Sequence, residues 1–212
     1  MDKKYELNID VRILELLGPN LYTNIYYVLA ELIANAYDAD AHNVYIISND
    51  DMIIVEDDGK GMSYSKGEIT KYLKVAAISR TNESDSKTAL DRLKMGRKGV
   101  GKLAALSVSE EVYVMTVSSG EKSGFVLSRH PQSESLQSIP DESIHFEKIT
   151  GNGTAIVMLK PQYHLHKTPT AIKRNLLKIF PAISEDFKIH IIMGDKEDVI
   201  DSVDKEIGKE LC

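Results

Sequence analysis

Three short segments hold the side chains that are able to do chemistry in this chain. The segment ELIANAYDAD (31–40) places acids and an amide at helical spacing, VEDDGKGM (55–62) ends an apolar run on acids and glycines, and GRKGVGKLAA (96–105) is rich in glycine. Carboxylate and amide oxygens bind hard cations or orient water, and glycine amides at the start of a helix bind phosphate. Together the segments predict a pocket for a nucleotide and its metal.

The first segment is a helix with a polar arc beside its apolar stripe. At about 100° per residue, Glu31, Asn35 and Asp38 fall on one side of the helix. A solvated polar edge is the simplest interpretation of such an arc. The chemical alternative makes Glu31 a general base for water and Asn35 a ligand for magnesium.

The second segment ends a β-hairpin. VYIISN (44–49) and MIIVED (52–57) alternate between apolar and polar residues around a short polar turn. Asp57 closes the second strand, and Gly59 and Gly61 allow a ligand to approach the backbone closely. A carboxylate there accepts a hydrogen bond from an exocyclic amine, such as that of adenine. An ordinary Asp-Gly turn and a calcium loop are the alternatives, and the missing glutamate at the required offset disfavours an EF-hand.

The third segment resembles two better-known phosphate loops without matching either. A P-loop would need a hydroxyl where Leu103 stands, and a dinucleotide fingerprint would need a strand where 79–95 is polar. What remains is a glycine-rich turn before a helix, which binds phosphate through its amides. Residues 87–102 hold six bases and one acid in a chain of net charge −6, which indicates a local anion site or a solvated loop.

In this order and spacing, the segments resemble the ATP-binding domain of the GHKL superfamily. That superfamily includes gyrase B subunits, ninety-kilodalton heat-shock chaperones, sensor histidine kinases, MutL proteins and Microrchidia ATPases. Four sequence features of the superfamily have counterparts here: the E-x-x-N-x-x-D-A, D-x-G-x-G and G-x-x-G-x-G boxes and a late Gly-Thr pair. The glutamate of the first box favours a Microrchidia-like or chaperone-like branch. The matching residues are Glu31, Asn35, Asp38 and Ala39; Asp57, Gly59 and Gly61, followed by Met62; Gly96, Gly99 and Gly101; and Gly153 with Thr154.

The resemblance implies an ATPase with a Bergerat fold that binds ATP or ADP together with Mg²⁺. It makes Glu31 the general base, Asn35 the magnesium ligand and Asp57 the residue that recognises adenine. The other nucleotide contacts that it implies are Gly59, Gly61 and Met62 near the base, Thr154 beside Asp57 through water, and Gly99, Val100, Gly101 and Lys102 at the phosphates.

Related ATPases complete this site with a lysine or arginine from a following domain. We therefore expect weak turnover from this chain alone, and hydrolysis that drives a conformational or dimerisation cycle in a longer protein. The resemblance implies an ATP-dependent homodimer through the N-terminal residues 5–18, with a protein or DNA client left open. Two alternatives remain: a histidine-kinase catalytic domain and a nucleotide-sensing module without hydrolysis. About twenty residues precede the first helix, which disfavours the kinase.

Length and pattern predict one α/β (α+β) two-layer sandwich, with helices on one face of a mixed, mostly antiparallel sheet. We place the domain at 1–195, with a lid at about 79–98, and expect the charged tail 196–212 to begin a linker or another domain. Helices are expected at about 20–39, 63–78 with Ser63 as N-cap, 100–107 and 168–180. Beyond the hairpin, strands are expected near 111–118, 123–129, 143–148, 154–160 and 186–194, with a loop at 130–142.

Composition excludes several classes of protein. No apolar run approaches the ~20 residues of a membrane span, and the N-terminus has no apolar signal region. The single cysteine, Cys212, allows no internal disulfide. With 26 basic and 32 acidic residues, the chain is not a general nucleic-acid coat. These features predict a cytoplasmic protein without membrane contact.

Overall fold

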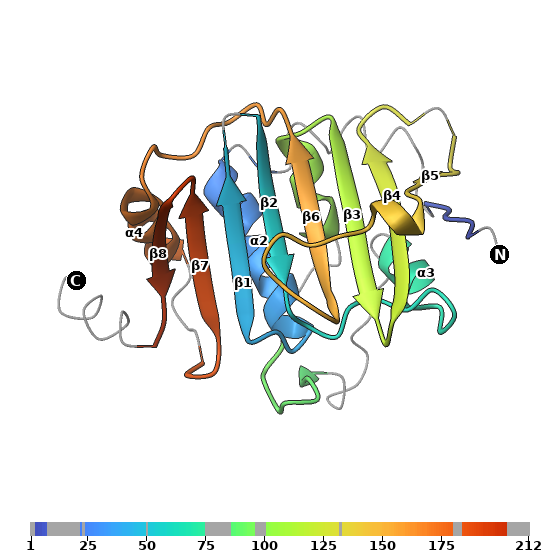
Figure 1. The fold of residues 1–212 in the computed structure, drawn as a ribbon, viewed down its shortest axis with the longest axis horizontal. Coiled ribbons are helices and arrows are strands. Elements are labelled where there is room, and N and C mark those ends of the chain that lie inside the picture. Colours follow the sequence, from blue (N-terminus) through green and yellow to red (C-terminus); the bar gives the residue numbers. More distant parts are fainter. Residues whose placement is uncertain are drawn as a thin grey trace.

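An eight-stranded mixed sheet organises the chain (Figure 1). The computed structural model describes residues 3–7, 22, 24–49, 51–74, 86–95, 101–131, 133–179 and 184–202. The strand order is β5-β4-β3-β6-β2-β1-β7-β8, in which β1 and β7 are parallel and the other pairs are antiparallel. The strands are β1 Asn43–Ser48, β2 Met52–Asp57, β3 Glu111–Ser118, β4 Glu121–Ser128, β5 Gln137–Ser138, β6 Gly153–Leu159, β7 Lys188–Met193 and β8 Lys196–Ile200.

Helices cover one face of this sheet, as predicted, and α2, α3 and η2 lie behind the strands in Figure 1. The side chain of Asn24 caps α2 by accepting a hydrogen bond from the amide of Tyr26 at 2.9 Å. Buried residues of α2 such as Leu29 and Ile33 join Ile53 and Val55 of β2 in one core. The helices are α2 Ile25–Asp38, α3 Glu68–Leu73 and α4 Pro169–Ile179, with short 3-10 helices η2 Gly101–Ser107 and η3 Asp141–Ser143. The mixed α/β sandwich is therefore confirmed.

Strand alternation gives β2 two different faces. Ile53 and Val55 lie in the core under the helices, and Asp57 is on the same side. Glu56 points to the opposite face, is only 1% exposed, and accepts hydrogen bonds from the amides of Glu147 at 2.7 Å and Lys148 at 2.9 Å. This carboxylate fastens the segment between η3 and β6, which crosses the open face of the sheet in Figure 1.

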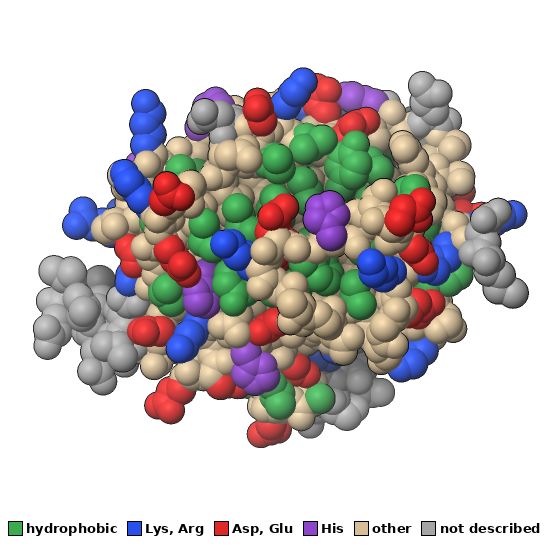
Figure 2. Space-filling view, viewed as in Figure 1, with side chains coloured by type: hydrophobic (Ala, Val, Ile, Leu, Met, Phe, Trp, Pro, Cys, Tyr) green, Lys and Arg blue, Asp and Glu red, His purple; other side chains and the backbone are tan. Residues whose placement is uncertain are grey.

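A hollow of about 460 Å³ lies between that crossing segment and the open face of the sheet. Figure 2 shows hydrophobic side chains gathered on this face. Because the hollow and Asp57 are on opposite faces of β2, it is separate from the chemistry of the sequence motifs. Its apolar lining includes Met52, Ile54, Tyr113, Met115, Val157 and Leu159.

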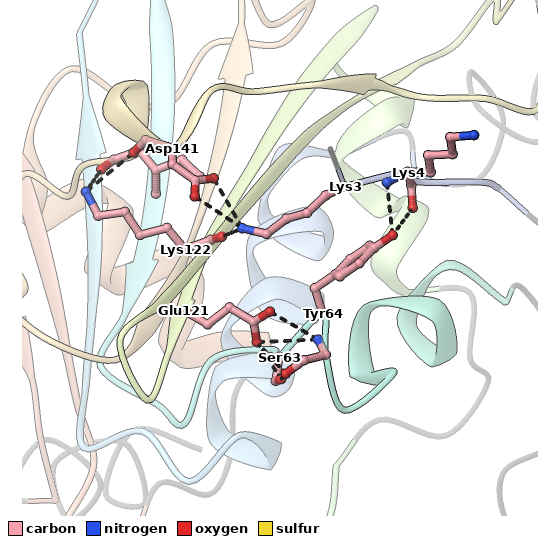
Figure 3. Close-up of polar contacts among 9 residues, drawn as sticks. Lys3, Lys4, Ser63, Tyr64, Glu121, Lys122 and Asp141 are labelled. Atoms are coloured by element: carbon pink, nitrogen blue, oxygen red, sulfur yellow. Dashed lines mark hydrogen bonds and ion pairs between the residues drawn. The ribbon is translucent and has the colours of Figure 1, made fainter. Parts of the chain in front are cut away.

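The N-terminal residues 3–7 pack on their own domain (Figure 3). The amide of Leu7 donates to the carbonyl of Glu134, and Tyr5 is buried against Phe125. Tyr64 accepts from the amide of Lys4 and donates to its carbonyl oxygen. The segment is thereby attached to the turn that follows the D-x-G-x-G box. Residues 8–18 of the predicted N-terminal lead lie outside the described residues.

Several predicted elements differ from the structure. The strand predicted at 143–148 is wrong, because the amides of this segment bond to Glu56 instead of a neighbouring strand. The predicted helix 63–78 is shorter in the structure, since α3 begins after Gly67; Ser63 accepts from the amide of Lys66 and thus caps the turn before α3 instead of α3 itself. The helix predicted at 100–107 is the 3-10 helix η2, and β5 lies within the predicted loop 130–142.

The predicted domain end at residue 195 falls inside a hairpin. β8 pairs antiparallel with β7 at the edge of the sheet, so the sheet continues to Ile200. The sequence pattern did not predict β8 because the strand is charged. Lys196 and Glu197 are exposed on an edge strand, where polar residues are tolerated.

Loss of the Glu56 carboxylate should destabilise the crossing segment. We predict that Glu56→Ala lowers the free energy of unfolding by ~2 kcal/mol, because two amides lose a charged acceptor. Urea unfolding measures this, with Glu147→Ala as the matched control, since that substitution removes an exposed side chain and keeps the amide donor. Equal unfolding midpoints for the Glu56 variant and the wild type would contradict the role of this carboxylate.

Candidate functional site

Asp57 lies where three parts of the chain meet at the end of β2. Its backbone is paired with Thr154 at the start of β6, and its carboxylate accepts a hydrogen bond from the amide of Gly59 at 3.0 Å. The side chain is half-buried. Desolvation by the surrounding protein raises the pKa of Asp57 to about 7, although the Gly59 amide opposes the shift. A carboxyl with a pKa raised by burial on the helix side of the sheet is a candidate for a functional position.

Close backbone contacts surround this carboxyl. A Cβ on Gly59 would lie 2.8 Å from the carbonyl oxygen of Ala39, at the end of α2. Gly61 has a φ of +66°, and a Cβ there would lie 2.0 Å from the carbonyl oxygen of Val117. A Cβ on Gly153 would lie 2.1 Å from the carbonyl oxygen of Asp57. Glycine is therefore required at these positions for steric reasons, and the loop is held tightly against α2, β3 and β2.

A buried hydroxyl joins the glycine loop to β6, and sequence reasoning missed it. Thr116 of β3 accepts from the amide of Met62 at 2.9 Å and donates to the carbonyl of Gly153 at 3.0 Å. Its remaining contact is with the hydroxyl of Thr154, 3.3 Å away. Since Thr116 has a single proton, the Thr154 hydroxyl donates to it and keeps its own oxygen as an acceptor beside Asp57. No motif signals Thr116, because a threonine in an alternating strand is ordinary.

Glu31 and Asn35 lie on α2, both half-buried. Tyr22 forms a hydrogen bond with Glu31, and burial, this hydrogen bond and the charge of Glu31 together raise the pKa of Tyr22 to about 12. The phenol therefore stays protonated and donates to the carboxylate. This contact holds one side of the Glu31 carboxylate, and no sequence motif indicates it.

Asn35 suits magnesium that arrives with phosphate. Among the described residues its side-chain amide has no hydrogen-bond partner, and no three His, Cys, Asp or Glu residues gather to form a metal site by themselves. One neutral oxygen fits an ion that keeps several waters and takes its other ligands from phosphates. The residues present therefore fit Mg²⁺ as a companion of a nucleotide.

The C-terminal end of α2 binds two segments of the chain near Asp57. The amide of Lys60 donates to the carbonyl of Ala39 at 3.0 Å, and the amide of Met95 donates to the carboxylate of Asp38 at 2.7 Å. The Asp38 carboxylate therefore joins residue 95 to the end of α2.

The phosphate end of the predicted site is only partly described. Gly101 begins η2, which contacts α2. Gly99 and Val100 and the side chain of Lys102 lie outside the described residues, so their predicted contacts stay predictions. The same holds for the lid, of which 86–95 is described. In the described ranges, no helix has the length and apolar character needed to cross a membrane.

The described part of the site combines two chemical capabilities. Asp57, with the Thr154 hydroxyl beside it, offers acceptors that are able to bind an amine donor. Glu31 and Asn35 present a carboxylate and an amide oxygen on neighbouring turns of one helix.

Two comparisons with known proteins bear on this arrangement. The model of the family described as histidine kinase-, DNA gyrase B-, and HSP90-like ATPase matches residues 22–154, a span that begins at the Tyr22 contact with Glu31 and ends at Thr154. The protein named Putative type II restriction enzyme HgiDII, from Herpetosiphon aurantiacus, is 28% identical over 203 residues, which are 92% of this chain and 32% of that protein. This chain thus spans about a third of that relative's length. The family match covers more than half of the chain and includes every motif, so the chain belongs to the histidine kinase-, DNA gyrase B-, and HSP90-like ATPases.

Proposed function

We propose that this domain binds Mg-ATP and, within a longer protein, hydrolyses it to drive a conformational or dimerisation cycle. The observation that carries the proposal is the Asp57 carboxyl, held by glycine contacts at a strand end with a pKa of about 7. Adenine offers it an amine donor, and the hydrogen bond strengthens when the carboxyl is ionised.

The residues of this chain have separate roles in the proposed reaction. Asp57 accepts from the adenine amine, and Thr154 holds a water beside it. Glu31, oriented by Tyr22, takes a proton from water at the γ-phosphate. Asn35 supplies one oxygen to Mg²⁺, which neutralises phosphate charge during transfer. Lys102 and the amides of Gly99, Val100 and Gly101 are proposed for the phosphates.

The Tyr22 contact favours hydrolysis over the two rival functions. A histidine kinase would transfer phosphate to a protein and a sensing module would keep its ATP, so neither needs a carboxylate oriented toward water. We place the domain in the Microrchidia-like or chaperone-like branch on the same ground. The relative from Herpetosiphon is named a putative restriction enzyme, which supports DNA as the client of the longer protein. ATP-dependent dimerisation and a cytoplasmic location remain part of this proposal.

Adenosine affinity should depend on pH through Asp57. With a pKa near 7, the carboxyl is mostly ionised at pH 8 and mostly neutral at pH 6. We therefore expect adenosine to bind about tenfold more weakly at pH 6 than at pH 8. Adenosine is the right probe for calorimetric titration because it has no phosphate that titrates in this window. Asp57→Asn should bind about tenfold to a hundredfold more weakly at pH 8, with no pH dependence between the two values.

The stability of Asp57→Asn without ligand serves as the folding control for this experiment. Because the pKa of Asp57 is raised in the folded protein, the folded state binds more protons than the unfolded state between about pH 4 and 7. This group therefore lowers stability as the pH rises through that window. Without ligand, Asp57→Asn should be more stable than the wild type at pH 8, and the difference should shrink toward pH 4. An adenosine affinity that is flat with pH in the wild type would refute the assignment.

Hydrolysis should depend on Glu31 more than binding does. We predict that Glu31→Gln lowers phosphate release by ~100-fold or more, since general-base catalysis contributes on this scale, and changes ATP affinity little. Released phosphate is measured with saturating Mg-ATP on the full-length protein. Tyr22→Phe keeps the carboxylate and should cause a smaller loss. Unchanged turnover in Glu31→Gln would leave the non-hydrolysing module as the better account.

Magnesium should bind only together with nucleotide. Because Asn35 offers a single neutral oxygen, Asn35→Ala should weaken Mg-ATP binding by about tenfold and leave metal-free ADP binding nearly unchanged. Titrations in Mg²⁺ and in EDTA separate the two effects. Tight magnesium binding by the protein without nucleotide would be inconsistent with this site.

A further inference from the structure

The segment that crosses the open face of the sheet is attached to the strands at two points. Ile144 is buried with Val126 of β4 in a second, smaller apolar cluster. Further along, the amides of Glu147 and Lys148 donate to the carboxylate of Glu56 on β2. Because both points are fixed, this stretch bridges the sheet without filling the space beneath it, and the hollow of about 460 Å³ is part of the fold.

The size and the walls of the hollow suit a small organic molecule. Sites for small molecules in proteins commonly have volumes of roughly 300–1,000 Å³ and mainly apolar walls. Here the walls come from neighbouring strands and include Ile54 of β2, Met115 of β3 and Val157 of β6. Figure 2 shows hydrophobic side chains at the surface around the crossing segment. An apolar ring placed there is removed from water, which favours binding.

The charged groups of the lining are acidic. Of the described residues that line the hollow, Glu56 and Glu147 are acids and none is a lysine or an arginine. The imidazole of His145 also lines it, and its Nδ1 lies 2.9 Å from the carbonyl oxygen of Ser143. This nitrogen therefore carries a proton, and Nε2 is an acceptor in the neutral ring. The polar part of the hollow thus suits a positively charged donor and disfavours an anion.

Glu56 keeps acceptor capacity although it is buried. Its Oε1 accepts from the amide of Glu147 at 2.7 Å, and its Oε2 accepts from the amide of Lys148 at 2.9 Å. A carboxylate oxygen has two lone pairs, so each oxygen is able to accept one further hydrogen bond. Because the residue is only 1% exposed, little water competes for this position, and a charged donor gains a strong hydrogen bond there.

We propose that the hollow is a binding site for a small apolar amine. Its aromatic or aliphatic body packs against the strands, and its protonated amine donates to Glu56 and is attracted by the charge of Glu147. Asp57 lies on the opposite face of β2, so this site is separate from the proposed nucleotide site and does not depend on it.

Three naphthalene compounds test the preference for charge, because they share one ring system and differ in the head group: 1-naphthylmethylamine, 1-naphthalenemethanol and 1-naphthoate. In calorimetric titrations of the wild-type protein at pH 8, the amine should bind at one site, about tenfold more tightly than the alcohol. The naphthoate should bind more weakly than the alcohol, since its negative charge lies beside two acids. Asp57→Asn removes the carboxylate of the candidate functional site and should leave the affinity for the amine unchanged.

Substitutions at the hollow should weaken amine binding in two ways. Glu147→Gln removes a charge and keeps the backbone amide that donates to Glu56, so affinity for the amine should fall by about threefold and affinity for the alcohol should not change. Glu142→Gln is the matched control, because this exposed acid of η3 is not among the residues that line the hollow. Met115→Lys places a positive charge in the wall and should weaken the amine by about tenfold or more. Tyr27→Lys, at an exposed position on α2, should have no effect.

Nuclear Overhauser contacts between the bound amine and methionine methyl groups locate the ligand without any substitution. Met52 and Met115 line the hollow, so contacts to these methyl groups support the proposal. Their absence overturns it, and so do contacts to Met62, which follows the D-x-G-x-G box.

The titrations are decisive in the same way. Failure of the amine to bind, or equal affinities for the three compounds, overturns the proposal. A loss of amine affinity in Asp57→Asn as large as that in Met115→Lys would place the amine at the candidate functional site and also overturns it. Should Met115→Lys not fold by circular dichroism, the comparison of Glu147→Gln with Glu142→Gln decides. A loss confined to the Glu147 variant supports the site, and equal affinities in the two variants overturn it.

Discussion

The C-terminal end of α2 is the constraint on which the rest of this site depends. The carboxylate of Asp38 accepts a hydrogen bond from the amide of Met95, and the carboxylate of Asp40 accepts from the amides of residues 89 and 90. The carbonyl of Ala39 accepts from the amide of Lys60 in the glycine turn, and the carbonyl of Ala41 accepts from the side chain of Arg92. Two side-chain carboxylates and two backbone carbonyls at and just after the helix end thus bind the segments that surround the site. Motifs that are far apart in the sequence are thus positioned by one helix, which also carries Glu31 and Asn35.

Neighbouring residues of β2 point to opposite faces of the sheet, so Glu56 and Asp57 lie in different environments. Glu56 faces outward, where it is fully bonded to backbone amides and holds the crossing segment. Asp57, the next residue, faces the helices, where burial raises its pKa to about 7. The crossing segment leads into Gly153 and Thr154, which pack against and pair with Asp57. A structural carboxylate and the carboxylate proposed to bind adenine therefore lie on the two faces of one strand, and the raised pKa of Asp57 costs stability at high pH.

Regular elements with clear periodicity were predictable from the sequence, and contacts between distant residues were not. The helix around Leu29, the hairpin and the strand after Gly153 follow apolar patterns, and the motifs located Glu31, Asn35 and Asp57 on them. The region 143–148 alternates like a strand, yet its amides bond to a side chain, which no local pattern reveals. The polar run at 86–95 suggested a loose loop, but the acids of α2 and the buried Arg92 hold it. In each case tertiary hydrogen bonds override local pattern.

The proposed function depends above all on recognition of adenine by the carboxylate at the end of β2. Competition between ATP and GTP for the wild-type protein tests this directly, because the two share every phosphate and differ at the base. Adenine presents an amine donor where guanine presents a carbonyl acceptor. A carboxylate accepts from the former and repels the latter, so ATP should bind about 100-fold more tightly than GTP at pH 8. Equal affinities for the two nucleotides would contradict the assignment of Asp57.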